Sequence, residues 1–320
     1  MADEDQVAVR VAWLYYMEGL TQDGIATRLG LTRLRVNRLL GEARESGLVS
    51  IKINSRHESC LRLEEELREA CGLREAVIIP TPESPDLIPV LLGRTAGEYL
   101  SNHLETHRVR GLGVGWGATL REAIRHVAPG RWPNLHVNSM MGGLTRGLEI
   151  NTFETASALA ARLGAQCSYL AAPLYAGSAR SRDTIVSQDV FKEAFSQIAA
   201  NDVALLSVGD LSTRSLLVRY GLPKDVPVAG LRQAKAVGDI IGQFLDRHGK
   251  PVKHALNLRV VAPSLEELAR IPTVIVASGG ENKAPVIAAV LRAKLLSVLI
   301  CDEQTARTAL KLYRALAAQA

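Results

Sequence analysis

From residue 76 onward, short runs of β-branched and other apolar residues alternate with longer amphipathic segments. The expected strands are residues 76–80, 110–115, 135–141, 167–172, 202–209, 258–262, 273–280 and 296–301. The expected helices between them include residues 86–103, 118–127, 151–163 and 284–293. Strands that alternate with helices of this length form βαβ units and a mainly parallel sheet. The pattern therefore predicts a large α/β domain, whose ligands should bind beyond the carboxyl ends of the strands.

The loop after residues 110–115 is rich in glycine. Gly115 and Gly117 lie on the turn between the expected strand and helix, and Thr119 lies near the start of that helix. Backbone N–H groups at a helix N-terminus have no partners within the helix and attract anions. We therefore expect this loop to hold an anionic group of a ligand.

The same loop also matches a loose dinucleotide-binding pattern, G-x-G-x-x-A, at Gly113, Gly115 and Ala118. A nicotinamide cofactor would in addition require an acidic residue about 20 residues later, at the end of the next strand. The expected strand at residues 135–141 is instead followed by two glycines. The absent acid weakens the hypothesis of a redox sensor that binds such a cofactor.

Two further loops carry polar residues in apolar surroundings. Asp239 follows a glycine in KAVGDIIGQF, and Lys283 lies between an expected strand and helix in ASGGENKAPVI. A carboxylate can accept hydrogen bonds from sugar hydroxyls, and a lysine at a helix start can hold a phosphate as a point charge. Taken singly, Asp239 is as well explained as a turn former and Lys283 as a surface charge. Together with the loop at residues 115–119, they favour a pocket for a phosphorylated sugar.

A stretch near the N-terminus, TQDGIATRLGLTRLRVNRLLGEARES, carries the spacing of a helix-turn-helix. Thr21 and Thr32 are the expected N-caps, and the apolar residues that follow each of them fall on one helical face. Gly30 occupies the bend. Ala26 lies where two helices that cross at about 90–120° approach most closely, so that a larger side chain would separate them.

The outward face of the second helix of this pair is cationic. Residues 28–38 contain four arginines and no acid. Arginine can bond bidentately to guanine and asparagine to adenine, while threonine and arginine also reach phosphates. The expected DNA-binding residues are Thr32, Arg33, Arg35, Asn37 and Arg38. The alternative is a solvated cationic face on an ordinary helix pair, but the glycine turn, the alanine at the crossing and the N-terminal position favour DNA binding.

Three segments flank the pair. Apolar spacing predicts a helix at residues 5–18 that completes a three-helix core, and alternation at residues 48–53 predicts a short strand, as in a winged helix-turn-helix. The charged segment 58–71 has the spacing of a connector helix, either packed against its mate in a dimer or solvated as a spacer. The expected domains are a winged helix-turn-helix (1–56), a connector helix (57–72) and an effector-binding α/β domain (73–320).

The composition fits a cytoplasmic protein of two domains. At 320 residues the chain is too long for one small domain, and 47% of its residues are hydrophobic, enough for a large core. The net charge of +5 permits nucleic-acid binding without requiring it. Four scattered cysteines indicate neither a zinc site nor a disulfide framework, and we expect no metal or cofactor. The acidic start MADEDQ is wrong for a signal peptide, and no apolar run suits a membrane span.

Several of these stretches together resemble the SorC family of sugar-responsive bacterial transcriptional regulators. The resemblance runs from AWLYYMEGLTQDGIATRLGLTRLRVNRLLGEARESGLV through VGWGATL, MMGG, AAP, KAVGDI and GGENKAPVI to LICDEQTA, nearly the whole chain. It implies a winged helix-turn-helix joined to an effector domain similar to sugar-phosphate isomerases and glucosamine-phosphate deaminases. It also implies a homodimer or homotetramer on the operator DNA of a carbohydrate or polyol operon.

Carried over to this sequence, the resemblance implies a set of effector contacts. They are Gly115, Trp116, Gly117, Thr119, Gly142, Gly143, Asp239 and Lys283. Lys235 and the bulky Trp116 depart from the family pattern, which points to an unphosphorylated or unusually shaped polyol. The N-terminal part is most similar to regulators of erythritol-type polyol catabolism. The expected effector is therefore a small sugar, polyol or sugar phosphate.

The rival interpretation is an enzyme, because the same kind of sheet houses sugar-phosphate isomerases and deaminases. Such chemistry needs a general base and a partner acid placed at the sugar carbons. Asp239 is the best candidate among the loop carboxylates, and Glu281 is a poor second. The fused DNA-binding domain favours a sensor, so we assign no catalytic residue.

Overall fold

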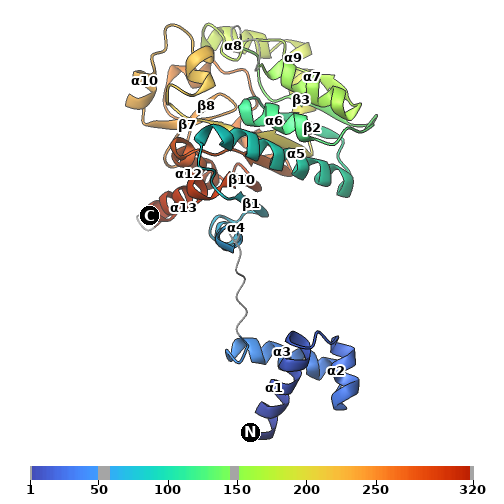
Figure 1. Cartoon of the computed structure of the whole chain (residues 1–320). Helices are drawn as coiled ribbons and strands as arrows, with labels where there is room; N and C mark the ends of the chain where they lie inside the picture. Colours follow the sequence, from blue (N-terminus) through green and yellow to red (C-terminus); the bar gives the residue numbers. More distant parts are fainter. Residues whose placement is uncertain (1, 50–57, 145–150, 318–320) are drawn as a thin grey trace. The chain divides into compact units, whose positions relative to one another are not determined.

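The computed structural model describes residues 2–49, 58–144 and 151–317, and the chain divides into two units, Met1–Ser55 and Arg56–Ala320 (Figure 1). The boundary between the units falls beside the expected domain limit at residue 56. The segment 57–72, expected as a separate connector, is part of the larger unit. Within the described ranges, no helix has both the length and the apolar character that crossing a bilayer requires.

The smaller unit contains the predicted helix pair. Its helices are α1 (Ala2–Tyr16), α2 (Gln22–Leu29) and α3 (Arg33–Glu45). The Thr21 hydroxyl caps α2 by accepting a hydrogen bond from the Gly24 N–H, and the Thr32 hydroxyl caps α3 through the Arg35 N–H, both at 3.2 Å. Gly30 ends α2 in the left-handed conformation, with φ 65°. The caps and the bend are those expected from the sequence.

The three helices enclose a small apolar core. Its buried members are Val11, Leu14, Ile25, Ala26, Val36, Leu39 and Leu40. The first helix differs from the expected range 5–18, because it begins at Ala2 and ends at Tyr16. Gly19 causes the earlier end: it takes φ 67°, and the Leu20 N–H then donates to the Leu14 carbonyl at 3.0 Å, which closes the helix.

The expected wing strand at residues 48–53 lies largely outside the described residues, which stop at residue 49 in this region. Leu48 and Val49 are described and do not form a strand. The Val49 N–H donates to the Ala43 carbonyl at 2.9 Å, beside Gly47 with φ 77°. These two residues therefore close the end of α3.

The larger unit is built on a seven-stranded sheet. In spatial order its strands are β1 (Glu75–Ile79), β10 (Val298–Asp302), β9 (Thr273–Ala277), β5 (Val203–Leu206), β2 (Gly111–Val114), β3 (His136–Ser139) and β4 (Gln166–Ser168). All neighbouring pairs are parallel, which confirms the predicted α/β class. From β2 the chain proceeds to β3 and β4 and then returns to β5 on the other side of β2. The strand order therefore reverses between β2 and β5, where open α/β sheets bind ligands.

Helices cover both faces of this sheet (Figure 1). One core lies under α5 (Ile88–Thr106), α6 (Ala118–His126) and α7 (Thr152–Leu163), and the other lies under α4 (Glu58–Cys71), α9 (Asp189–Ala199), α12 (Ala284–Arg292) and α13 (Glu303–Ala317). Successive residues of a strand enter opposite cores: Val203 and Leu205 belong to the first, Ala204 and Leu206 to the second. Burial on both faces explains why these strands are continuous apolar runs.

A small antiparallel sheet, not predicted from the sequence, lies beside the large one. Its strands are β6 (Val208–Gly209), β7 (Ala236–Ile240) and β8 (Gln243–Asp246), in that order. The expected strand at residues 258–262 is wrong. The helix η3 (Ala255–Leu258) ends inside this range, and Val260 forms a single bridge to Tyr175. Its apolar run is buried in the core without pairing along its length, and periodicity alone cannot distinguish these cases.

The remaining elements are short and lie in the connections. They are η1 (Pro85–Leu87), α8 (Ala179–Val186), η2 (Leu217–Gly221), α10 (Val228–Gln233), α11 (Leu265–Arg270) and η4 (Glu281–Lys283). Among these, η1 and η4 follow the carboxyl ends of β1 and β9. They therefore contribute to the edge of the sheet where a ligand should bind.

Helix α4 has the predicted bounds but not the predicted surroundings. Its apolar face, with Cys60, Leu63 and Leu67, is buried in the larger unit against β1 and α13. Glu64 accepts a hydrogen bond from the Ile78 N–H of the edge strand β1 at 2.7 Å. The helix is thus an integral part of this unit rather than a solvated spacer, and the face expected to meet a second copy is already covered.

Candidate functional site

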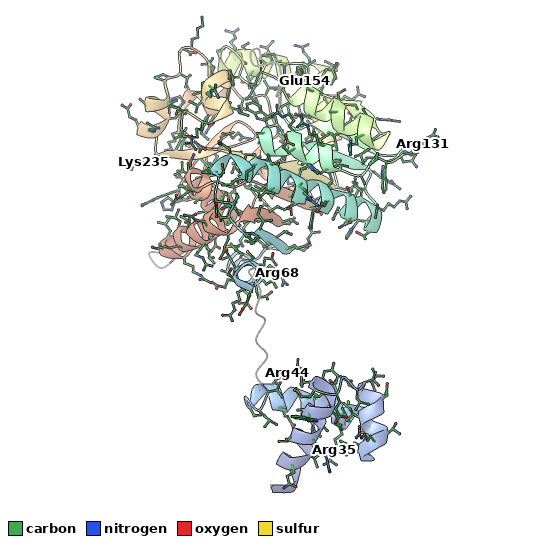
Figure 2. The ribbon with its side chains drawn as sticks, viewed as in Figure 1. Arg35, Arg44, Arg68, Arg131, Glu154 and Lys235 are labelled. Atoms are coloured by element: carbon green, nitrogen blue, oxygen red, sulfur yellow. The ribbon has the colours of Figure 1, made fainter. Side chains whose placement is uncertain are left out.

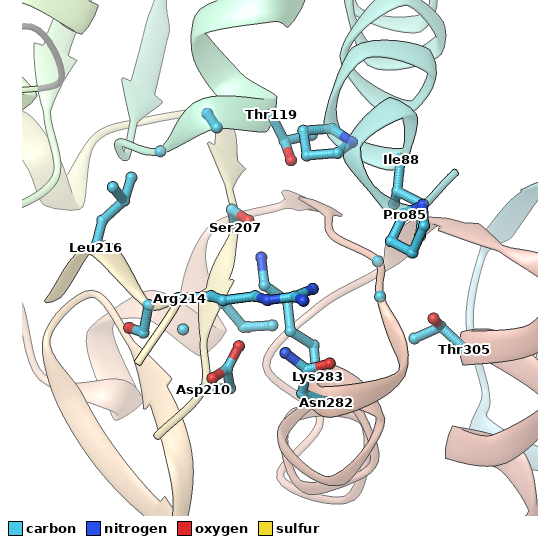
Figure 3. Close-up of a pocket in the computed structure, with 18 of the residues that line it drawn as sticks. Pro85, Ile88, Thr119, Ser207, Asp210, Arg214, Leu216, Asn282, Lys283 and Thr305 are labelled. Atoms are coloured by element: carbon cyan, nitrogen blue, oxygen red, sulfur yellow. The ribbon is translucent and has the colours of Figure 1, made fainter. Parts of the chain in front are cut away.

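A cavity of about 550 Å³ lies at the carboxyl ends of β1, β2, β5, β9 and β10, and Figure 3 shows part of its wall. Loops after each of these strands line it, and β7 of the small sheet adds a further part. The volume is within the range of about 300–1,000 Å³ that is usual for small-molecule sites. The cavity includes the point between β2 and β5 where the strand order reverses, as expected for an open α/β sheet.

Five of the eight expected effector contacts line this cavity. They are Trp116, Gly117, Thr119, Asp239 and Lys283. The first three follow β2, Asp239 belongs to β7, and Lys283 ends η4. The sheet topology thus brings together residues that the sequence separates by more than a hundred positions.

The other three, Gly115, Gly142 and Gly143, do not line it, which corrects the expectation for them. The Gly115 N–H donates to a β5 carbonyl at 3.0 Å and extends the pairing of β2 with β5. A Cβ at Gly142 would lie 2.7 Å from two carbonyl oxygens, and the Gly143 N–H donates to the Ala172 carbonyl at 2.9 Å. Gly142 permits close contact between backbones, whereas a Cβ at Gly143 would lie 2.6 Å from the Phe153 ring. The preceding residue, Met141, lines the cavity instead.

Asp239 is buried in the cavity wall, with 5% of its surface exposed. Its Oδ2 accepts a hydrogen bond from the Gly242 N–H at 3.1 Å, and Oδ1 has no partner among the described residues. Burial raises the pKa of Asp239 from 3.8 to about 7, a rise that the Gly242 N–H and Lys283 oppose and Asp210 increases. Gly209 lies opposite on β6, where a Cβ would be 2.2 Å from Oδ1. The glycine is therefore required for the position of this carboxyl.

Lys283 is connected to the centre of the sheet by two serines. Its Nζ donates to Ser278 Oγ at 3.3 Å, and the Ser207 hydroxyl donates to the same oxygen at 3.3 Å. Burial lowers the pKa of Lys283, whereas the carboxylates of Asp210 and Asp239 raise it. The two neighbouring acids thus favour the charged form of the lysine, and burial opposes it.

Sequence reasoning missed five charged residues of the wall: Glu83, Asp86, Asp210, Arg214 and Asp302. Asp210 is 5% exposed, and its Oδ1 accepts the Ser212 N–H at 2.6 Å. Asp302 is 1% exposed and ends β10. Both acids stand at the end of an apolar run, in LLSVGD and VLICD, and that position was the signal that would have identified them. Arg214 lies in an irregular loop, where the sequence pattern gives no such signal.

The N-terminus of α6 forms another part of the wall. Gly117 is its N-cap, with φ 131°, and no side chain caps the first turn. Backbone N–H groups of such a turn, and the exposed Arg214, attract anions. Carboxylates such as Asp210 and Asp239 accept hydrogen bonds from hydroxyls. Among the described residues, no cluster of His, Cys, Asp and Glu is arranged to hold a metal ion.

The expected DNA-binding residues all lie exposed on α3 or at its cap: Thr32, Arg33, Arg35, Asn37 and Arg38. Arg35 near the start of α3 and Arg44 near its end are labelled in Figure 2. Arg33 pairs with Asp23 at 3.5 Å and Arg38 pairs with Glu42 at 3.3 Å, both on the surface. Exposed pairs contribute only about 0–1 kcal/mol, so phosphates can replace these acids at little cost.

Known proteins similar to this chain cover both the unit with the cavity and the unit with the helix pair. The Sugar-bind family model, described as "Putative sugar-binding domain", matches residues 55–311. The transcriptional regulator LsrR of Klebsiella pneumoniae is 33% identical over 316 residues, which cover 97% of this chain and 94% of the relative. The erythritol catabolism regulatory protein EryD of Brucella abortus is 28% identical over 308 residues, covering 96% and 97%. The chain belongs to the SorC family of sugar-binding transcriptional regulators.

A solved structure extends the likeness to the whole length of a SorC-family protein. The full-length sorbitol operon regulator SorC from Klebsiella pneumoniae has a TM-score of 0.72, with 25% identity over 97% of this chain and 100% of that chain. A DeoR family transcriptional regulator from Listeria monocytogenes covers 78% of this chain and 98% of its own, also with a TM-score of 0.72 and with 26% identity. These relatives are named as regulators. The chain is therefore a transcriptional regulator with a sugar-binding domain, and the rival interpretation as an enzyme is wrong.

Proposed function

We propose that this SorC-family regulator controls a carbohydrate or polyol operon in response to a small polyol, sugar or sugar phosphate bound in the cavity. The observation that carries the proposal is the convergence of Asp210, Asp239 and Lys283 in the wall of a cavity of about 550 Å³, beside the point where the strand order reverses. Acidic and amino side chains at such a point can accept hydrogen bonds from ligand hydroxyls and donate to them. EryD and SorC are named for erythritol catabolism and the sorbitol operon, which favours a polyol.

The two parts of the wall support different contacts with such a ligand. Asp210, Asp239 and Lys283 form a polar group in which the carboxylates accept hydroxyls and the lysine donates to one. The α6 N-terminus at Gly117 and the side chain of Arg214 offer positive charge for a phosphate. We therefore propose that Lys283, whose charge two acids offset, binds hydroxyls, and that a phosphate, where present, binds near α6.

The DNA-binding face supports the second half of the proposal. We propose that Arg33, Arg35, Asn37 and Arg38 contact operator DNA in the major groove or at phosphates, while Thr32 mainly positions the start of α3. One recognition helix reaches few base pairs, so a homodimer or homotetramer would meet half-sites about 34 Å apart or multiples of that. The protein would act in the cytoplasm, where both the operon and the phosphorylated metabolites are found.

The ligand class can be tested by thermal denaturation of the full chain with erythritol, sorbitol, ribitol and their monophosphates. A ligand present at 100 times its Kd stabilises the folded protein by about 2.7 kcal/mol. For a domain of this size, that corresponds to a rise in Tm of about 5–10 °C. We expect at least one of these compounds to produce such a shift in the wild-type protein.

Variants make the assignment specific to the cavity. Asp239→Ala should abolish the shift, whereas Asp183→Ala, which removes an exposed acid of α8, should leave it unchanged. A shift that survives Asp239→Ala would mean that the ligand binds elsewhere. The absence of a shift with all of these compounds would contradict the proposed ligand class.

A further inference from the structure

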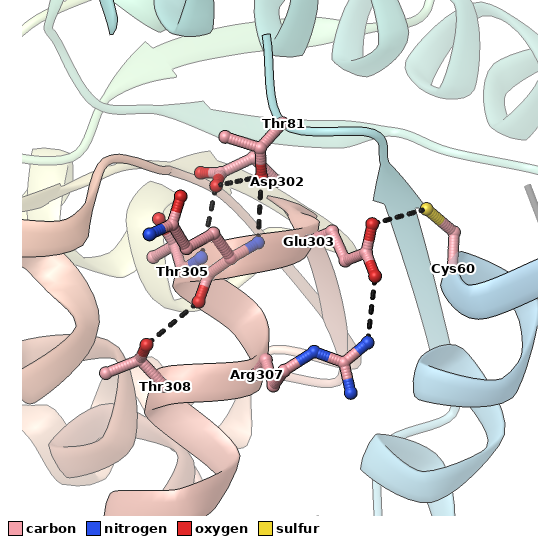
Figure 4. A network of polar contacts seen from close by, with 8 residues as sticks. Cys60, Thr81, Asp302, Glu303, Thr305, Arg307 and Thr308 are labelled. Carbon is pink, nitrogen blue, oxygen red and sulfur yellow. Dashed lines mark hydrogen bonds and ion pairs between the residues drawn. The ribbon is translucent and has the colours of Figure 1, made fainter. Parts of the chain in front are cut away.

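The cavity wall and helix α4 meet at two consecutive residues, Asp302 and Glu303, where β10 passes into α13 (Figure 4). Asp302 lines the cavity. Glu303, the first residue of α13, contacts the first turn of α4. Because α4 directly follows the segment that leads from the DNA-binding unit, this junction joins the cavity to the start of the effector domain.

Asp302 links three elements of the wall. Its Oδ1 accepts hydrogen bonds from the Thr81 hydroxyl at 3.0 Å and from the Thr305 N–H at 3.1 Å, so that it caps α13. Its Oδ2 accepts the Gly280 N–H at 2.9 Å, in the loop before η4. Thr305 also lines the cavity, and its buried hydroxyl has no partner among the described residues. A ligand that contacts this corner would therefore alter how α13 begins.

Glu303 makes its contacts with α4 and with the next turn of its own helix. Its carboxylate accepts a hydrogen bond from the Cys60 thiol at 3.8 Å and from the Arg307 guanidinium at 2.8 Å, and the Ser59 side chain also bonds to it. Cys60 is 1% exposed and the Glu303 side chain is 24% exposed, so the contact lies at the edge of the buried face of α4. Glu303 thus holds the first turn of α4 against the start of α13.

The rest of α4 has anchors of its own. Leu63 and Leu67 are buried in the core, and Glu64 accepts the Ile78 N–H at 2.7 Å. Glu66 pairs with Arg314 at 3.0 Å on the surface, two turns along the helix from Cys60. These contacts do not involve the cavity wall. Within the described parts of the chain, it is therefore the first turn of α4 that depends on the residue next to Asp302.

We infer that Glu303 is a positioning residue that transmits ligand contact at Asp302 and Thr305 to the first turn of α4, and so to the segment leading to the DNA-binding unit. The inference rests on the proposed function for its ligand, but the connection itself does not require a ligand. A change in the cap of α13 shifts Glu303, which releases or tightens Ser59 and Cys60. The strength of this contact then differs between the liganded and unliganded protein.

The Cys60 thiol is a built-in reporter of this connection. Thr81→Val and Asp302→Asn alter the cavity wall. We expect each of them to raise the rate at which iodoacetamide alkylates Cys60 by at least about fivefold, which is the lower end of the coupling usually found between two sites. Cys71, buried at the other end of α4, is the matched control and should change by less than about twofold on the same scale. Modification of each cysteine in the full chain is followed by mass spectrometry of its peptide.

A double-mutant cycle tests whether the connection passes through Glu303. In Glu303→Gln the Cys60 rate should already be high, and adding Asp302→Asn should raise it little further, because coupled residues are not additive. Three results would overturn the inference. The first is an alkylation rate of Cys60 that Thr81→Val and Asp302→Asn leave unchanged. The second is an equal rise in the alkylation rates of Cys60 and Cys71. The third is a double variant in which Glu303→Gln and Asp302→Asn have fully additive effects on the Cys60 rate.

Operator binding supplies the functional readout, with erythritol, sorbitol and their monophosphates as probes. Glu303→Gln should bind the effective probe as the wild-type protein does, while the ratio of operator affinities with and without the probe falls toward one. Glu66→Gln, which removes the surface pair with Arg314, should keep the wild-type ratio. If the ratio of operator affinities with and without the probe were the same in Glu303→Gln as in the wild-type protein, the inference would be refuted. If no probe binds the wild-type protein, the ligand class of the proposed function fails, and the Cys60 rates still decide the connection.

Discussion

Replacing Asp239 by asparagine should change how the stability of the effector domain depends on pH. Burial raises the pKa of this carboxyl from 3.8 to about 7 in the folded protein. The folded state therefore binds the proton more tightly than the unfolded state. Stability from this proton is fully present below pH 3.8 and is lost as the pH rises through about 7. Asparagine has no proton to lose and keeps an acceptor for the Gly242 N–H.

The size of the effect follows from the pKa difference. At about 1.4 kcal/mol for each pH unit, the rise from 3.8 to about 7 corresponds to about 4 kcal/mol in total. About 2 kcal/mol of this is lost between pH 5.5 and the pKa near 7. The neighbouring charges of Asp210 and Lys283 share part of the response. The stability of Asp239→Asn relative to wild type should therefore rise by about 1–2 kcal/mol between pH 5.5 and pH 8.

Urea denaturation at the two pH values measures this difference. In a Trp13→Phe background, which removes the tryptophan of the smaller unit, the fluorescence of Trp116 and Trp132 follows the transition of the larger unit. Asp183→Asn, at an exposed site on α8, is the control and should differ from wild type by the same small amount at both pH values. An equally constant difference for Asp239→Asn would refute the reasoning, because it would mean that Asp239 does not change its protonation state in this range.

Three further predictions address the two sites. Arg33→Ala or Arg35→Ala should weaken operator binding by about 1–3 kcal/mol in gel-shift titrations. Arg44→Ala, at the far end of α3, is the control and should bind the operator as the wild-type protein does. Unchanged operator binding by both Arg33→Ala and Arg35→Ala would contradict the proposed DNA-binding face. Gly209→Ala should reduce ligand affinity, because the added Cβ would displace Asp239. Gly177→Ala is the control and should not reduce it, because Gly177 has open space around it. Calorimetric titration with the effective polyol measures both affinities. Lys283→Ala should weaken binding of erythritol and of its phosphate alike and leave operator binding by the unliganded protein intact. If Lys283→Ala lost affinity for erythritol phosphate but not for erythritol, Lys283 would hold the phosphate, as predicted from the sequence.

Much of the fold followed from local signals in the sequence. Thr21, Thr32 and Gly30 fix the ends of α2 and α3 through their own caps and left-handed turn, so the helix pair could be predicted without tertiary information. The parallel strands were recognisable because both of their faces are buried. The small antiparallel sheet was not, because β6 has only two residues and β7 begins just after Lys235, a non-glycine residue with φ 64°. The β6 strand also depends on a pairing partner, β7, about 30 residues further along the chain.

The site could be predicted where chemistry and loop position coincide. Trp116, Gly117, Thr119, Asp239 and Lys283 lie at strand ends or helix starts, and all of them line the cavity. Gly142 and Gly143 lie outside the cavity lining, because a glycine after a strand can serve close packing as well as ligand binding. A Cβ at Gly142 would meet the Ala172 carbonyl, and one at Gly143 would meet the Phe153 ring. The amphipathic pattern of α4 likewise predicts a buried face but does not say which surface buries it. Its contacts with α13 depend on residues more than 200 positions away as well as on its own sequence.

The most direct test of the central claim is the affinity of the protein for its operator with and without a saturating polyol or polyol phosphate. Fluorescence anisotropy with a labelled promoter fragment gives both values under the same conditions. We predict a change of about 5–150-fold in the wild-type protein, with the same factor in ligand affinity when DNA is present, and no change in Asp239→Ala. An operator affinity that stays constant while the ligand fills the cavity would contradict the claim that this cavity controls DNA binding.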